Sequence, residues 1–287
     1  MSTDAESESV DFRLYRYNPS LGAAVLFTIL FLIASAIHTY QALRTRTWFL
    51  IAFVLGGYFE CIGYIGRAVS ATESPTFSLG PYITQTLLLL IAPTLFAASI
   101  YMELGRLVIL TSGDAYISIP RRYLTKVFLA GDILSFIMQG AGGGIMASGT
   151  LSAVQTGEKI IIGGLVIQLL FFSVFVYTAV RFHVGLKRRG TSSPAFSGKA
   201  LPPWRRHMRA LYIGSGLIFV RSLFRLVEYA QGNGGYLVSH EVYLYLFDAV
   251  LMVGVMGVFG VLHPSEVCAY LKEGGRGKVV YRVIWVR

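Results

Sequence analysis

The chain has 287 residues, of which 54% are hydrophobic and 14% charged, and its formal net charge is +10. This composition is too apolar for a soluble protein of this length and indicates a polytopic membrane protein. The excess of basic residues lies in connections beside apolar segments. There it indicates which side of the membrane each connection faces, and it attracts anionic membrane lipids. Nothing in the charge distribution indicates a nucleic-acid partner.

Seven apolar stretches are long enough to cross a bilayer, which takes about 20 residues for roughly 30 Å of hydrocarbon. The predicted spans are Ser20–Tyr40, Trp48–Ala68, Tyr82–Leu104, Leu124–Ser148, Lys159–Val180, Arg209–Ala230 and Val242–Leu262. At this length only helices satisfy their own backbone hydrogen bonds in lipid. The sequence therefore predicts an all-α fold, a seven-helix transmembrane bundle over residues 20–262. Residues 1–19 would form an acidic tail and residues 263–287 a basic one.

Lysine and arginine gather in alternate connections and give the orientation of the bundle. They are densest between Lys187 and Arg206, whereas residues 71–80, 149–158 and 231–241 contain neither. Because cytosolic loops carry the basic excess, the amino terminus is predicted to lie outside and the carboxyl terminus in the cytosol. The leading segment MSTDAESESVDF is acidic, unlike the basic start of a signal peptide, and we expect a short disordered extracellular tail.

Six ionisable side chains fall inside the predicted spans, and helical rise places them in the outer half of the membrane. They are Glu60, Arg67, Arg221, Arg225, Glu228 and Asp248. A lone charge at the bilayer centre costs roughly 2.5–3.5 kcal/mol, so these three acids and three bases should pair or line a wet cavity. Arg225 and Glu228, three residues apart, can pair locally. Arg221 is then predicted to pair with Glu60 or Asp248.

Three further polar side chains complete the candidate translocation site: Gln85 in the third span, and Asp132 and Gln139 on one face of the fourth. Pro93 removes a backbone hydrogen bond from the third span and is expected to open room beside it. Two roles stay open for the charged residues. They clamp helices together, or at least one of them handles a substrate.

Several classes of protein lack their required residues in this sequence. The seventh span has no lysine for a retinal Schiff base, and no Walker motif is present. The histidines are scattered, which argues against a metal site; His240 with Glu241 is interpreted as a surface cap. Cys61 and Cys268 lie at different depths, so no disulfide is expected. We therefore predict no catalytic residues, no metal, no cofactor and no enzymatic activity, while a seven-helix receptor stays an alternative.

Several unusual intramembrane motifs occur in a fixed order. They are YFECIGYIGR (58–67), LLLIAPTLFAASIYMELGR (88–106), GDILSFIMQGAGGG (131–144) and VRSLFRLVEY (220–229), then HE at His240 and Glu241 and FD at Phe247 and Asp248. From Tyr17 to His263 the chain resembles the fungal RTA-like lipid-translocating exporter family. The resemblance implies a seven-helix protein of the fungal plasma membrane that exports or translocates amphipathic lipids such as sphingoid long-chain bases. Relatives are similarly linked to aminosterol resistance and porphyrin movement. The alternative is a lipid or stress sensor of the same fold without transport.

Overall fold

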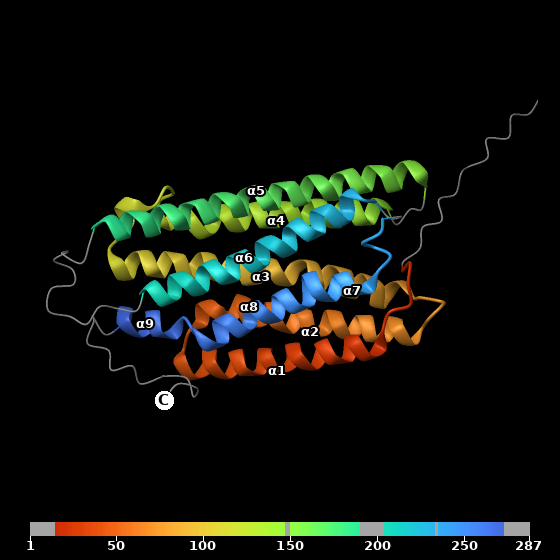
Figure 1. The fold of residues 1–287 in the computed structure, drawn as a ribbon, viewed down its shortest axis with the longest axis horizontal. Coiled ribbons are helices and arrows are strands. Elements are labelled where there is room, and N and C mark those ends of the chain that lie inside the picture. Colours follow the sequence, from red (N-terminus) through yellow and green to blue (C-terminus); the bar gives the residue numbers. More distant parts are fainter. Residues whose placement is uncertain (1–14, 147–149, 190–203, 233–234, 273–287) are drawn as a thin grey trace, which may run out of the picture.

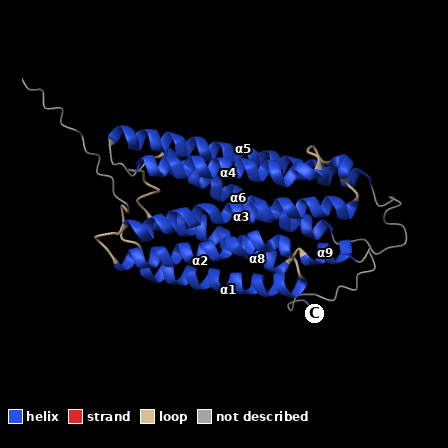
Figure 2. Cartoon of the chain, turned by 180° about the vertical axis from the view of Figure 1, so that it is seen from behind, coloured by secondary structure: helices blue, strands red, loops and turns tan. Residues whose placement is uncertain are grey.

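The computed structural model describes residues 15–146, 150–189, 204–232 and 235–272, which form helices joined by loops (Figures 1 and 2). The α-helices are α1 Leu21–Thr45, α2 Ile51–Thr72, α3 Leu79–Thr111, α4 Arg121–Met146, α5 Leu151–Arg189, α6 Trp204–Ala230, α7 Glu241–Leu244, α8 Val250–Val261 and α9 Ser265–Lys272. Two short 3₁₀ turns, η1 Trp48–Leu50 and η2 Asp114–Tyr116, and one π-helical turn, η4 Tyr245–Ala249, complete the described elements.

The seven predicted spans are confirmed, because the described residues contain seven helices long and apolar enough to cross a membrane. The seventh begins with α7, passes through η4 and continues into α8. Figure 1 shows α4 and α5 along one edge of the bundle, α1 and α2 along the other, and α3, α6 and α8 between them. The protein is thus a multi-pass, all-α membrane protein. We call the end at which α1 begins the Ser20 end, and the opposite end the α9 end.

Apolar side chains fill the interior of the bundle and also cover its surface. Leu26 and Leu170 are 54% and 62% exposed, whereas Phe53 and Phe175 are buried. This distribution suits a bundle whose outer surface contacts lipid rather than water. On α2, Gly63 lets α3 approach closely, since a Cβ there would lie 2.7 Å from the Leu89 side chain.

One expectation about the ends of the bundle is corrected. Helix α5 begins at Leu151, whereas the predicted span begins at Lys159, because hydropathy falls at Glu158 and Lys159 although the helix continues through both residues. The amino-terminal segment is anchored at Tyr15, which is buried and packs on the rings of Phe77 and Tyr82. The disorder expected for the leading segment MSTDAESESVDF stays a prediction. Residues 1–14 lie outside the described part.

The orientation of the bundle stays a prediction, which epitope tags can test. A tag placed before Phe12 should bind antibody on intact cells, because the basic connections are expected to face the cytosol. A tag placed after Arg287 should bind antibody only after the membrane is permeabilised. The reverse labelling pattern would invert the orientation.

Candidate functional site

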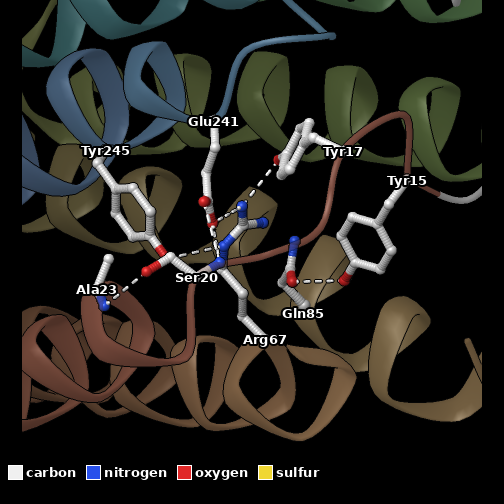
Figure 3. Close-up of polar contacts among 8 residues, drawn as sticks. All are labelled: Tyr15, Tyr17, Ser20, Ala23, Arg67, Gln85, Glu241 and Tyr245. Atoms are coloured by element: carbon white, nitrogen blue, oxygen red, sulfur yellow. Dashed lines mark hydrogen bonds and ion pairs between the residues drawn. The ribbon is translucent and has the colours of Figure 1, made fainter. Parts of the chain in front are cut away.

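Arg67 is the centre of a polar cluster at the Ser20 end of the bundle (Figure 3). Its side chain is fully buried, and Nη2 donates to Glu241 Oε1 at 2.7 Å and to the Tyr17 hydroxyl at 2.8 Å. Nε donates to the Tyr245 hydroxyl at 3.0 Å. The guanidinium also lies 5.4 and 5.2 Å from the ring centres of Tyr17 and Tyr245. One arginine on α2 therefore holds the amino-terminal segment and the start of the seventh span.

Glu241 extends this cluster to α1. Its two carboxylate oxygens accept from the backbone N–H of Ser20 at 2.9 and 3.0 Å, and Ser20 caps α1 by accepting from Ala23 N–H at 3.3 Å. The interpretation of Glu241 as a surface cap was wrong, because its side chain is only 15% exposed and pairs with Arg67. The signal in the sequence was an acid directly before the apolar run of the seventh span.

Gln85 joins the same region, as predicted, through the amino-terminal segment. The Tyr15 hydroxyl donates to Gln85 Oε1 at 2.8 Å, and Figure 3 shows this pair beside Arg67. Burial raises the pKa of Tyr17, so its hydroxyl stays neutral and accepts from Arg67. The tyrosines thus cover the Arg67 cluster without adding charge to it.

Arg221 forms the second ion pair, deeper in the bundle, and its partner is Asp248. Nε donates to Asp248 Oδ1 at 2.5 Å and Nη2 to Oδ2 at 3.4 Å, with both side chains 3% exposed. Of the two partners predicted for Arg221, the structure selects Asp248 rather than Glu60. Asp248 lies in η4, and single π-helical turns inside helices occur frequently at functional sites.

The remaining partner of Arg221 is a backbone carbonyl that Pro93 leaves free. Arg221 Nη2 donates to the carbonyl oxygen of Leu89 at 2.6 Å. In an α-helix that carbonyl would accept from the N–H of residue 93, which a proline lacks. Helix α3 continues through Pro93, so the proline leaves a free acceptor inside the bundle. The freed Leu89 carbonyl therefore serves as a hydrogen-bond acceptor for the buried Arg221 guanidinium.

The third ion pair joins Arg225 and Glu228 within α6, as predicted, at 2.7 Å. Together with the six predicted charges, Glu241 gives four acids against three arginines. Pairing Arg67, Arg221 and Arg225 with one acid each leaves Glu60. The Glu60 side chain is fully buried, and neither carboxylate oxygen has a hydrogen-bond partner among the described residues. The predicted balance of three acids and three bases was therefore incomplete.

Asp132 and Gln139 lie away from these charges. Asp132 accepts from the Tyr101 hydroxyl at 2.9 Å, about 18 Å further along α3 than Leu89 by helical rise. Gln139 Nε2 donates to Ser135 Oγ at 2.7 Å and to Gln168 Oε1 at 3.3 Å. Both side chains join α4 to neighbouring helices, a common use of polar groups in membranes. The structure therefore does not place them with the other seven candidates.

A polar cluster at the α9 end was not predicted. His207 is fully buried, with Nδ1 3.3 Å from Glu103 Oε1 and Nε2 3.1 Å from Glu266 Oε2. The three side chains connect α3, α6 and α9. Glu103, an acid inside the predicted third span, was the signal that could have indicated it. Within the described ranges no group of three or more His, Cys, Asp or Glu side chains is arranged to hold a metal ion.

Relatives of this chain are known in fungi. It is 37% identical to protoporphyrin uptake protein 1 of Saccharomyces cerevisiae, over 87% of this chain and 91% of that protein. It is 30% identical to the probable lipid transporter atnI of Emericella nidulans, over 88% and 68% of the two chains. With the sphingoid long-chain base transporter RSB1 of S. cerevisiae it shares 28% identity, over 86% and 72%.

No solved structure matches the chain. The family described as RTA1 like protein matches residues 53–270, which include most of α2, all of α3 through α8, and the ion pairs of Arg67, Arg221 and Arg225. That range is most of the sequence, and all the motifs that suggested the family lie within it. The chain belongs to the RTA1-like family of fungal membrane proteins.

Proposed function

We propose that this protein moves amphipathic lipids, such as sphingoid long-chain bases, between the leaflets of the plasma membrane, and that it is not an enzyme. Two relatives support lipid transport by their names, one a probable lipid transporter and one a sphingoid long-chain base transporter. A lipid of this kind has a cationic head group and an apolar chain. The head needs a polar site inside the membrane, while the chain can stay in the surrounding lipid.

The observation that carries this proposal is the set of charges buried at the Ser20 half of the bundle. Small residues and hydroxyl groups would join helices at lower cost than ion pairs whose charges must leave water. Seven of the predicted site residues are retained for head-group passage: Glu60, Arg67, Gln85, Arg221, Arg225, Glu228 and Asp248. We assign Asp132 and Gln139 to helix packing.

Transport can be tested with purified protein in liposomes and a fluorescent long-chain base. Wild-type protein should accelerate movement of the base between leaflets relative to protein-free liposomes. Glu228→Gln should lose that acceleration while staying folded, because the Arg225–Glu228 pair lies within one helix and does not join helices. The control is Glu73→Gln, a carboxylate outside the bundle that accepts from Ser78, and it should behave as wild type.

Two outcomes would contradict the proposal. Wild-type protein that leaves the leaflet exchange rate unchanged would favour the receptor alternative. Undiminished lipid movement in folded Glu228→Gln would show that this buried carboxylate does not handle the head group.

A further inference from the structure

One face of α2 carries buried polar atoms in a column that the ion pairs do not account for. Glu60, Tyr64 and Arg67 are four and three residues apart, so they share a face of the helix. Both Glu60 oxygens, the Tyr64 hydroxyl and Arg67 Nη1 have no hydrogen-bond partner among the described residues. The column leads from Arg67, at the Ser20 end, to Glu60 in the interior of the bundle.

The surroundings of Glu60 determine which cation it can hold. Among the described residues, the charged and titratable groups that interact with it are Asp248 of η4, Arg221 of α6 and Tyr64 of α2. Arg221 is already paired with Asp248, and that second carboxylate disfavours another negative charge nearby. A single carboxyl offers too few oxygens for a metal cation, which takes about six ligands. A proton or an ammonium group is the cation that fits.

We propose that Glu60 is an exchangeable proton site, and that a proton bound there is replaced by the ammonium head of the transported lipid. This inference rests on the proposed function and adds to it the ion whose movement is coupled to lipid transport. With no lipid bound, Glu60 is a neutral carboxylic acid, which avoids an unpaired buried charge. When the ammonium arrives from the leaflet at the α9 end, Glu60 releases its proton to the water on that side, and the carboxylate pairs with the head group.

The exchange balances in charge and in protons. One ammonium enters the site as one proton leaves, so the net charge of the site does not change. When the lipid departs to the leaflet at the Ser20 end, a proton from that side returns to Glu60 along the α2 column, where the Tyr64 hydroxyl can both accept and donate it. One proton therefore crosses the membrane in the direction opposite to each lipid cation, and the cycle is electroneutral.

The test uses the same liposomes, with a pH-sensitive dye trapped inside and the membrane voltage clamped by potassium and an ionophore. Wild-type protein should couple proton movement to movement of the long-chain base, after subtraction of protein-free liposomes, in which the amine itself carries protons. Glu60→Gln should lose the coupled proton movement, and Tyr64→Phe should slow it. Glu103→Gln removes another fully buried acid, outside the column, and should retain the coupling.

A second measurement separates this inference from lipid transport. The infrared spectrum of detergent-purified protein should contain the carbonyl band of a protonated carboxylic acid that Glu60→Gln abolishes and Glu103→Gln leaves in place. If the wild type moves no lipid, the proposed function fails, and the band still shows whether Glu60 is protonated. Identical spectra for wild type and Glu60→Gln, or undiminished coupled proton movement in Glu60→Gln, would overturn the proton site.

Discussion

Asp248→Asn is expected to lower the free energy of unfolding by about 3–5 kcal/mol, because it leaves the Arg221 guanidinium charged and uncompensated in the interior. The Leu89 carbonyl alone cannot neutralise that cation. Unfolding of the purified protein in mixed micelles, titrated with a denaturing detergent, measures the change. The double variant Arg221→Gln with Asp248→Asn should lose less stability than the two single variants together, since it removes both charges.

Glu228→Gln is the matched control for this experiment. It also removes a carboxylate paired with an arginine, yet its partner Arg225 lies on the same helix and is more exposed than Arg221, at 14% against 3%. Its effect on the free energy of unfolding should be smaller. Equal losses for Asp248→Asn and Glu228→Gln, or additive losses in the double variant, would show that the Arg221–Asp248 pair does not join α6 to the seventh span.

The arrangement around Arg221 also shows how far the sequence could predict the site. The seven helices followed from hydropathy, and the Arg225–Glu228 pair from spacing within one helix, because both depend on neighbours in the chain. The sequence left two acids, Glu60 and Asp248, as possible partners of Arg221, because the choice depends on how α6 packs against α2 and the seventh span. The π-helical turn that holds Asp248 left no clear pattern in the sequence.

Polar groups were missed where their partners come from distant segments. Glu241 is close in sequence to no arginine, and it meets Arg67 only when the seventh span packs beside α2. His207 likewise meets Glu103 and Glu266 through packing of α3, α6 and α9. A freed carbonyl was predictable from Pro93, but its use by Arg221 was not. A single sequence predicts which groups need partners better than it predicts which partner each one finds.

Arg67→Met is the second substitution with a large expected effect. It removes the donor that holds Tyr17, Glu241 and Tyr245, and it leaves the Glu241 carboxylate without its cation. We expect a loss of about 3–5 kcal/mol in the free energy of unfolding. Amide hydrogen exchange should also rise in residues 15–20, because Arg67 is what connects Tyr17 to α2. Detergent unfolding and mass-spectrometric hydrogen exchange measure the two effects.

Two conservative variants separate the parts of this effect. Arg67→Lys keeps a charge near Glu241 but cannot reach three partners with one planar group, so its loss should be intermediate. Tyr17→Phe keeps the ring beside the guanidinium and removes one hydrogen bond to a charged donor, which costs about 1.5–3 kcal/mol. If Arg67→Met changed stability no more than Tyr17→Phe, the charge pairing with Glu241 would contribute little. The amino-terminal segment would then be held by its tyrosine rings, through contacts such as those of Tyr15 with Phe77 and Tyr82.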